Sequence, residues 1–433
     1  MNIHFKNIYC ILPCAKTCGT GRSYEVKETN IYVTNDIISG IGTAPDGFIA
    51  DRTVQGKNKI LSVGLVNAHN HAYMSVFRNS ADDVLFEEWL FKRILPLEDK
   101  LVDEDIYWGT QLSCLEMLKS GTTTFLDMHI TKNIVPKAVE DVGMRAVISK
   151  GIVGEGTAEY GLTRLADAKE EINNFKNSKL VSFMLAPHAI YTCDSEYLKI
   201  VTEEAKKLNV PIHTHLAESP VELKDALEKY GKTPVEYLAD LGVFDVKTIC
   251  AHCVQLNDND IDIFKKYNVS VAANPVSNLK LANGIAPIKK MLDKGINVAI
   301  GTDGPASNNG QNMFREMNFH ALLHKGVNHD AEAVSALETY KCATENGAKA
   351  LALDNCGVLE VGKKADLFVM DINQPQFYPR NNLMSALCYS ARGTEIDMVL
   401  VDGKILIEDG KSTTLDEEKI YYNASKVIER ITK

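Results

Sequence analysis

From residue 61 onward, short apolar runs alternate along the chain with stretches that have helical apolar spacing. The runs, in chain order, are LSVGLVNA (61–68), TTTFLDM (122–128), MRAVIS (144–149), LVSFMLAP (180–187), VPIHTHLA (210–217), KTICAHCV (247–254), VSVAANP (269–275) and INVAIGTDG (296–304). Between them, residues 195–208 and 220–241 have the charge mixture and spacing of crossover helices. Eight such units predict an α/β fold, a parallel TIM-like (β/α)₈ barrel, with a doubly wound open sheet as the alternative.

The two ends of the chain have a different pattern. Residues 1–58 place turn signals at 35–36 and 45–47 between short alternating strands, and residues 357–433 repeat that style in ADLFVMD and MVLVDGKILIEDGK. We therefore predict that 1–58 and 357–433 pair into one small β-sandwich domain. Residues 59–356 would form the barrel beside it.

Composition narrows the class of protein. The 433 residues include 47 basic and 57 acidic side chains, a formal charge of −10, and no basic run stands out. This argues against a nucleic-acid partner. No stretch approaches the ~20 apolar residues of a membrane span, and the N-terminus lacks a signal-peptide pattern. Ten scattered cysteines fit a reducing compartment. We expect a cytoplasmic protein without a membrane partner.

The first barrel run ends in two histidines, His69 and His71, within GLVNAHNHAYMS. Residues i and i+2 of a strand share a face, so the two imidazoles should project together from its C-terminal end. Parallel barrels carry their sites at that end. Such a pair is typical of two histidine ligands that bind one metal ion, although two such histidines can also hydrogen-bond to neighbouring loops.

Polar residues also follow other predicted strands and would open onto the same face of the barrel. They are His188, His215 with Glu218, His252 and Asp303. Neutral imidazoles and a carboxylate that converge on one point supply ligands for a divalent metal and leave a position for water. We expect one divalent ion per subunit, with Zn²⁺ favoured and Fe²⁺ or Mn²⁺ as alternatives.

Six segments carry a resemblance to a known family: GLVNAHNHAYMS, FEEWLFKRILPLEDKL, HLAES, AHCVQL, NPVSNLKLANGIAPI and GTDGPASNN. Taken together, they make the chain similar to 5-methylthioadenosine/S-adenosylhomocysteine deaminases of the amidohydrolase superfamily over nearly its whole length. The resemblance implies a mononuclear metal held by His69, His71, His215 and Asp303. It also implies hydrolytic removal of the adenine 6-amino group from such nucleosides.

The expected chemistry gives roles to three side chains. A divalent cation lowers the pKa of a bound water to about 7, and the resulting hydroxide can attack C6 of an adenine ring. Glu218 would protonate N1 and then the leaving amine; its alternative role is a helix-start carboxylate. In the family pattern, His252 lies off the metal and would hold the hydroxide. Asp303 would both bind the metal and accept a proton from the water. The alternative is that Asp303 only stabilises a turn.

Other residues offer rival assignments. His213 shares the face of His215 but lies farther from the strand end and lacks the HxxE spacing, so we expect it to be a satisfied pocket or core histidine and not a metal ligand. His129, after the second strand, is expected to be a pocket or core histidine. Cys250 and Cys253 form a CxxC whose odd spacing turns the two side chains apart in a strand, which argues against a redox pair.

The segment EEWLFKRILPLEDK is expected to lie over the metal. Trp89 would supply an aromatic wall, and Glu98 could accept hydrogen bonds from both ribose hydroxyls. The resemblance suggests a base contact for His188, and we expect Ser307 and Glu218 among the substrate residues. Alternatively, Trp89 could simply pack in the core, and Glu98 could be a charged residue on the solvent-exposed face of a helix.

The 5′ end of the nucleoside is expected to meet Lys150 and Arg164. Relatives that accept S-adenosylhomocysteine use two arginines towards the amino-acid carboxylate, and here one matching place holds Lys150. Lysine keeps the charge but loses the bidentate fork. We predict weaker relative use of S-adenosylhomocysteine, with 5′-methylthioadenosine, adenosine and 5′-deoxyadenosine as the other substrates.

Two other functions compete with this prediction. A related hydrolase could act on guanine, a pterin or a triazine, but none of these free rings has the ribose diol that Glu98 would bind. A catalytically inactive scaffold is disfavoured because every proposed ligand and acid–base residue is present. The cytidine-deaminase type of zinc site needs HxE with PCxxC, and the chain has no such arrangement. Association into a homo-oligomer is an expectation from the family alone.

Overall fold

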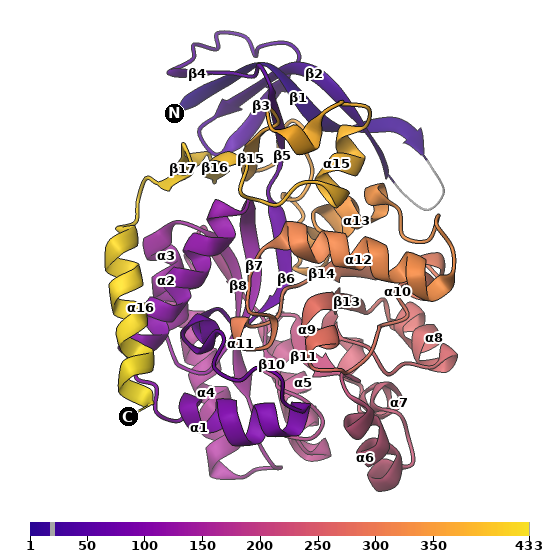
Figure 1. Ribbon diagram of the computed structural model, residues 1–433. Helices are drawn as coiled ribbons and strands as arrows, with labels where there is room; N and C mark the ends of the chain where they lie inside the picture. The colour runs from indigo at the N-terminus through magenta and orange to yellow at the C-terminus, as the bar shows by residue number, and fades with distance from the viewer. Residues whose placement is uncertain (18–21, 433) are drawn as a thin grey trace.

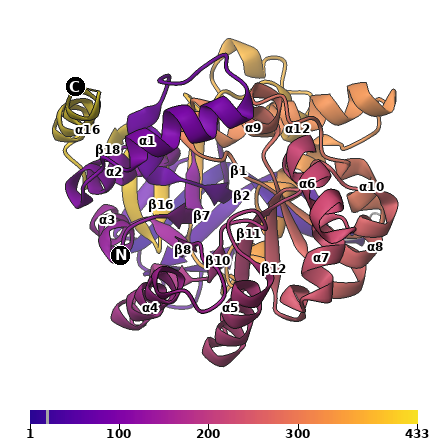
Figure 2. The same ribbon diagram turned by 90° about the horizontal axis from the view of Figure 1, so that it is seen from below.

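The computed structural model describes residues 1–17 and 22–432, and its centre is a barrel of parallel strands (Figures 1 and 2). The barrel strands are β6 (Leu65–Asn70), β7 (Thr122–His129), β8 (Arg145–Ile152), β9 (Val181–Phe183), β10 (Ala186–Pro187), β11 (Ile212–Leu216), β12 (Thr248–His252), β13 (Ser270–Ala273) and β14 (Asn297–Ile300). Strands β6, β7 and β8 pair in parallel, β9 and β10 both pair with β8, and β11 to β14 pair in parallel in chain order. A bridge from Leu185 to Ile212 joins the two halves, and the amide of Asp303 donates to the His69 carbonyl at 3.0 Å where the ring closes. The predicted barrel is confirmed, and the open sheet is wrong.

Helices cover the outside of the barrel, as crossover connections require. They include α2 (Asp103–Lys119), α3 (Ile134–Val142), α4 (Glu159–Asn174), α5 (Ser195–Leu208), α6 (Pro220–Tyr230), α7 (Pro234–Asp240), α8 (Asp258–Tyr267), α10 (Ile288–Asp293), α12 (Met313–Asn328), α13 (Ala336–Cys342) and α14 (Glu345–Ala350). The predicted helix 195–208 is confirmed. The predicted helix 220–241 is two helices, because Gly231 ends α6 in a left-handed conformation and Thr233 caps α7 just before Pro234.

Both chain ends contribute to a nine-stranded sheet above the barrel in Figure 1. Its strands are β1 (Asn2–Thr17), β2 (Arg22–Thr34), β3 (Ile37–Ile41), β4 (Arg52–Gln55), β5 (Lys59–Val63), β15 (Leu367–Asp371), β16 (Ile396–Val401), β17 (Lys404–Glu408) and β18 (Lys411–Ser412). Strand β5 lies between β1 and β15, so the N-terminal and C-terminal segments meet across it.

The run predicted as a single strand over 61–68 is divided at Gly64 between two sheets. Strand β5 belongs to the terminal sheet and β6 to the barrel. A Cβ atom at Gly64 would lie 1.9 Å from the Thr123 hydroxyl, so only glycine allows the chain to pass this close to β7. Gly64 therefore marks the point where the chain leaves the terminal sheet and begins the barrel.

The C-terminal segment also adds helices α15 (Leu383–Tyr389) and α16 (Glu417–Ile431) to the β strands. Helix α16, yellow in Figure 1, runs alongside α2, where Lys119 pairs with Glu417 at 2.7 Å and Arg430 pairs with Asp105. The C-terminal segment thus packs against the outside of the barrel through α16 and contributes strands to the terminal sheet.

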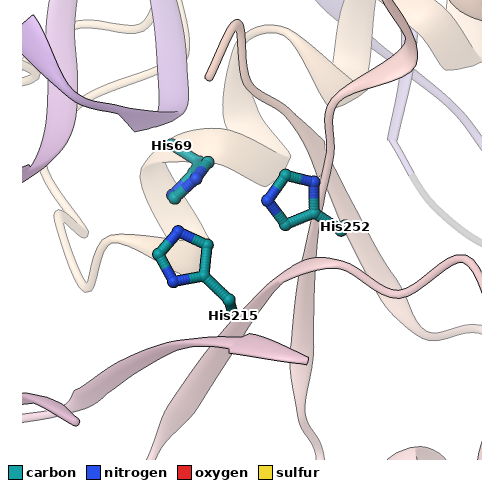
Figure 3. Close-up of side chains that lie close together, drawn as sticks. All are labelled: His69, His215 and His252. Carbon is teal, nitrogen blue, oxygen red and sulfur yellow. The ribbon is translucent and has the colours of Figure 1, made fainter. Parts of the chain in front are cut away.

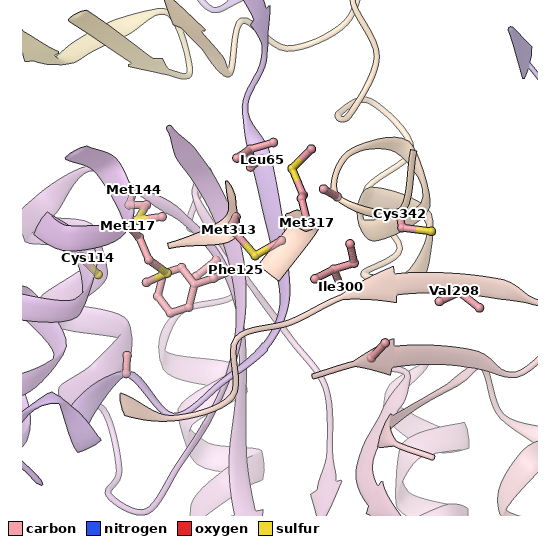
Figure 4. Close-up of a cluster of buried hydrophobic side chains, with 14 of the residues drawn as sticks. Leu65, Cys114, Met117, Phe125, Met144, Val298, Ile300, Met313, Met317 and Cys342 are labelled. Atoms are coloured by element: carbon pink, nitrogen blue, oxygen red, sulfur yellow. The ribbon is translucent and has the colours of Figure 1, made fainter. Parts of the chain in front are cut away.

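Two layers of apolar side chains hold these elements together. Figure 4 shows Leu65, Phe125 and Ile300 of the barrel strands packed near Met313 and Met317 of α12. A second cluster joins side chains from most barrel strands with α14, and it fills the barrel interior: Val66, Ala68, Leu126, Val147, Met184, Ile249, Ala272, Ala299 and Ala348. The C-terminal ends of the strands are left to polar side chains.

Two further observations bear on the predicted cellular setting. Among the described residues, no helix combines the length and the apolar character needed to cross a bilayer. Eight cysteines of the described chain are buried, and none of these eight forms a disulfide. The cytoplasmic location stays a prediction.

Candidate metal centre and active-site cavity

A cavity of about 440 Å³ opens at the C-terminal mouth of the barrel. Its lining brings together most of the residues predicted from the sequence: His71, Trp89, Glu98, Arg164, His188, His215, Glu218, His252, Asp303 and Ser307. It is a volume that a nucleoside-sized molecule can occupy. The cavity lies at the end of the barrel far from the terminal sheet.

A chain of hydrogen bonds fixes the tautomer of His69. The Ser149 hydroxyl donates to the Asp127 carbonyl at 2.7 Å, so it accepts from Nδ1–H of His213 at 2.9 Å. The other ring nitrogen of His213 is then an acceptor, and it receives Nδ1–H of His69 at 2.8 Å. His69 is left with a lone pair on Nε2, a buried atom that has no hydrogen-bond partner. His213 is therefore a buried histidine with both ring nitrogens hydrogen-bonded, and it orients His69.

Main-chain carbonyls orient the next two imidazoles in the same way. Nδ1 of His71 donates to the Met128 carbonyl at 2.8 Å, and Nδ1 of His215 donates to the His188 carbonyl at 2.9 Å. A carbonyl can only accept, so in the neutral imidazole the lone pair of each ring is on Nε2. Carbonyl groups that fix metal-binding histidines in this way are common around protein metal sites.

The three lone pairs converge with one carboxylate oxygen. Nε2 of His71 lies 3.2 Å from Nε2 of His215, and Oδ1 of Asp303 lies 3.3 Å from Nε2 of His69 and 3.5 Å from Nε2 of His71. Lone pairs at these distances repel one another unless a cation lies between them. Burial lowers the pKa of His69 to about 3 and holds that of His215 well below its usual value, so both stay neutral. The donor set fits a divalent metal ion.

Asp303 is held by its surroundings in one orientation. Its backbone is left-handed, with φ of 61°, and its Oδ2 accepts the hydroxyls of Ser277 and Ser307, each at 2.6 Å. Oδ1 is thereby left to the imidazoles.

Figure 3 shows His252 beside His69 and His215, and these three rings form a second close group of possible ligands. Nδ1 of His252 lies 2.9 Å from Oδ1 of Asn278, and its Nε2 lies 3.8 Å from Oε2 of Glu218. Glu218 is buried, and Asn283 donates to its Oε1 at 3.0 Å. Burial, aided by the charge of Asp303, raises the pKa of Glu218 well above its usual value.

Three of the predicted nucleoside residues, Trp89, Glu98 and His188, line other parts of the cavity. Trp89 is carried by η2 (Glu88–Ile94), and its indole donates to the Ala306 carbonyl at 3.2 Å. Glu98, at the end of α1 (Leu95–Glu98), accepts the Tyr73 hydroxyl at 2.5 Å. Nδ1 of His188 lies 3.1 Å from the Thr192 hydroxyl.

Lys150 is the predicted substrate residue that the cavity lining does not include. Its ammonium group donates to the Ile130 carbonyl at 3.0 Å, and the side chain is buried. Burial and the nearby Arg164 lower the pKa of Lys150. Arg164 itself does line the cavity, so one cation faces the cavity where the sequence predicted two.

Several residues of the site were not anticipated. Ser277, Asn278 and Asn283 lie within the segment NPVSNLKLANG, whose polar side chains after the seventh barrel strand were the available signal. Tyr73 follows the HxH pair directly, but nothing in its local pattern indicates a contact with Glu98.

A parallel barrel with a buried imidazole–carboxylate cage at its C-terminal mouth defines a metal-dependent barrel enzyme. The chain belongs to the amidohydrolase family, whose model matches residues 60–406. A 5-methylthioadenosine/S-adenosylhomocysteine deaminase of Thermoanaerobacter pseudethanolicus is 50% identical, over 93% of this chain and 94% of the relative. A 5′-deoxyadenosine deaminase of Methanocaldococcus jannaschii is 45% identical, over 93% and 96%.

Solved structures agree with this assignment. An adenosine deaminase from Xanthomonas campestris with bound zinc superimposes with a TM-score of 0.93 at 32% identity, and the match covers 99% of this chain and 98% of the other. Both the barrel and the terminal sheet are therefore shared with a structure that holds zinc.

Proposed function

We propose that the protein catalyses metal-dependent hydrolytic deamination of the adenine 6-amino group in 5′-methylthioadenosine, S-adenosylhomocysteine or related adenosine nucleosides such as 5′-deoxyadenosine. The products are the inosine analogue and ammonia. The observation that carries the proposal is the close approach of Nε2 of His71 to Nε2 of His215 and of Nε2 of His69 to Oδ1 of Asp303, with the buried Glu218, whose pKa is raised well above its usual value, lining the same cavity. The names of the similar deaminases support the substrate class.

One divalent ion per subunit, with zinc favoured, would be held by His69, His71, His215 and Asp303. It would supply a water whose pKa is lowered to about 7 and would polarise the reacting centre. The similar structure with bound zinc supports this choice of metal. His252 is kept outside this set because its Nε2 lies towards Glu218, where it can hold the attacking water.

The chain's own residues move the protons of the reaction. Asn283 donates to Oε1 of Glu218, so the acid carries its proton on Oε2, from which it protonates N1 of the ring. As the water oxygen bonds to C6, Asp303 accepts a water proton. The remaining proton of the C6 hydroxyl then passes through Glu218 to the exocyclic nitrogen, the C6–N bond breaks as the C6 carbonyl forms, and ammonia leaves. The proton held by Asp303 finally restores the acid form of Glu218.

The other wall of the cavity would hold the nucleoside. Trp89 would flank the base, His188 would contact its ring, and Ser307 would lie at the edge of the substrate site. Glu98 would accept the ribose hydroxyls, with Tyr73 holding the carboxylate in place. A ribose-binding carboxylate favours nucleosides over guanine, pterins or triazines, which have no diol.

The 5′ substituent would extend towards Arg164. Since Lys150 is engaged by a carbonyl and lies off the cavity wall, a charged amino-acid tail would find one cation, whereas a methylthio or methyl group needs none. We therefore propose that S-adenosylhomocysteine is the weaker substrate, and that 5′-methylthioadenosine and 5′-deoxyadenosine are used better.

The deciding experiment is an ammonia-release assay with added Zn²⁺ on 5′-methylthioadenosine, 5′-deoxyadenosine, adenosine and S-adenosylhomocysteine, with guanine as the control. We expect turnover of the nucleosides and none of guanine. Strong preference for S-adenosylhomocysteine would refute the argument about Lys150. A protein that binds no divalent metal and releases no ammonia would instead be a scaffold.

A further inference from the structure

The carboxylate of Asp303 has two oxygens, and the structure assigns them different partners. Ser277 and Ser307 both donate to Oδ2, although they lie on separate segments, α9 (Pro275–Lys280) and α11 (Pro305–Asn308). Only Oδ1 faces His69 and His71. The orientation of the carboxylate therefore depends on the relative position of two short helices.

One buried side chain contacts both of these helices. Glu316, on the first turn of α12, accepts the side-chain amide of Asn308 on Oε1 at 2.7 Å and the backbone amide of Val276 on Oε2 at 3.3 Å. Asn308 directly follows Ser307, and Val276 directly precedes Ser277. Glu316 has 1% exposure and lines no part of the active-site cavity, so it can act on the reaction only through its neighbours.

We infer that Glu316 is a positioning residue for the metal centre: by joining Asn308 to Val276, it holds the two serines that direct Oδ1 of Asp303 towards the imidazoles. This rests on the proposed function, because it assumes that Asp303 is a metal ligand. Asn308 tightens the link, since the same amide nitrogen donates to the Thr302 carbonyl at 2.6 Å, one residue before Asp303.

The substitution Glu316→Gln is the sharpest test, because it keeps the volume and removes one acceptor. Both donors that meet Glu316 are N–H groups, so the NH₂ of glutamine must face one of them. Partners that orient metal ligands typically change metal affinity by about 10–100-fold when they are removed. We expect a loss of Zn²⁺ affinity in that range for E316Q.

Glu171→Gln is a matched control. Glu171, on α4, is another carboxylate with 1% exposure, and it accepts a main-chain amide, that of Asn133, and contacts a ring nitrogen of His129. It touches neither serine nor Asp303. Its loss should cost stability but leave Zn²⁺ affinity within about threefold of the parent.

The experiment measures zinc dissociation by competition with a chromogenic chelator for the full-length protein, E316Q, E171Q, the S277A/S307A double variant and the triple variant. If Glu316 acts through the serines, E316Q adds little to the loss already present in S277A/S307A. Thermal unfolding of the metal-free proteins separates affinity from folding. Should E316Q fail to fold, Asn308→Ala, which removes the donor to Oε1, takes its place.

The outcomes are distinct. Weaker zinc binding in E316Q that disappears in the serine background supports the inference. Unchanged zinc binding in E316Q, or a loss that simply adds to that of the serine variant, overturns it and leaves the proposed function intact. A parent protein that binds no zinc overturns the proposed function and the positioning role together.

Discussion

The two walls of the cavity are built in opposite ways. On the metal wall, the ring nitrogens of His69 and His215 that face away from the cage are tied to a fixed partner, and both side chains are almost completely buried. On the wall that we propose for the nucleoside, Phe91 and Tyr191 line the cavity with 52% and 41% of their surface exposed. Trp89 reaches the barrel through one hydrogen bond to the Ala306 carbonyl.

This contrast indicates that the metal cage determines the reaction, whereas the aromatic wall determines which substrates are accepted. A cage whose hydrogen bonds are fixed before substrate arrives presets the chemistry, since its dipoles need no reorganisation during reaction. An aromatic, partly exposed wall can accommodate different 5′ groups. Related barrels can thus keep one reaction and differ in substrate, as the names of the similar deaminases illustrate.

The largest effect is expected at the cage itself. Asp303→Asn keeps the shape of the side chain. Its amide oxygen can take the place of Oδ2 and still accept hydrogen bonds from the hydroxyls of Ser277 and Ser307. The amide NH₂ then faces the imidazoles and cannot ligate. We expect ammonia release to fall by roughly 10³-fold or more and zinc to be lost. Zinc per chain and turnover, measured together, check this; a variant that keeps its zinc would exclude Asp303 as an essential ligand.

Glu218→Gln should leave the metal in place and remove the proton donor. General acid–base groups typically contribute 10²–10⁴-fold, so we expect kcat to fall by about 10²–10³-fold with zinc content unchanged. The control is the zinc stoichiometry of the same preparation. Near-parental kcat would mean that another group delivers the proton.

The raised pKa of Glu218 also predicts the shape of the pH profile. The acid form is the active one, so kcat should decline by about tenfold per pH unit above the pKa of Glu218, and stay free of this decline below it. The residual activity of E218Q should lack that alkaline limb. A profile of E218Q with the same limb would assign it to a different group.

A moderate effect is expected at the nucleoside wall. Glu98→Gln keeps the contact with Tyr73 possible but weakens acceptance from the ribose diol. Because hydrogen bonds to charged groups contribute about 1.5–3 kcal/mol, kcat/KM should fall by about 10–100-fold for nucleosides. A 2′,3′-dideoxy analogue should lose much less on the same substitution. Equal losses for both would place the ribose elsewhere.

The smallest effect is expected at the 5′ end. Lys150→Arg adds length and a bidentate fork, and should raise kcat/KM for S-adenosylhomocysteine by roughly threefold while leaving 5′-methylthioadenosine unchanged. The ratio of the two substrates in one assay removes errors in enzyme concentration. A decrease for S-adenosylhomocysteine would show that the bond of Lys150 to Ile130 is needed where it is.

The sequence predicted the parts of the site that follow from strand periodicity. His69 and His71 share a face by their spacing, and His215 and Asp303 end strands that parallel topology brings to one mouth. Local patterns do not encode contacts made across the barrel. One such contact is the donation of Ser277 and Ser307 to the same oxygen of Asp303. Another is the pair of hydrogen bonds by which Glu316 joins Asn308 to Val276.

Lys150 is a residue whose predicted contact the structure does not show, again because local sequence does not determine how loops pack. The resemblance led us to expect Lys150 at the 5′ end of the nucleoside, but its ammonium group donates to the carbonyl of Ile130, in the loop after β7. Whether a cation at a strand end faces the cavity or a neighbouring loop depends on how loops pack. Similarly, the division of 61–68 at Gly64 reflects the close approach of Thr123, a residue far along the chain.

The position of β5 means that the terminal sheet is completed late in translation. One residue, Gly64, separates β5 from β6, which carries His69, and β5 pairs with β15 on the side away from β1. Residues 367–371 leave the ribosome some three hundred residues after the first two histidines. Until they do, β5 keeps an open edge, so a nascent chain cut short of β15 has the start of the barrel but an unfinished terminal sheet.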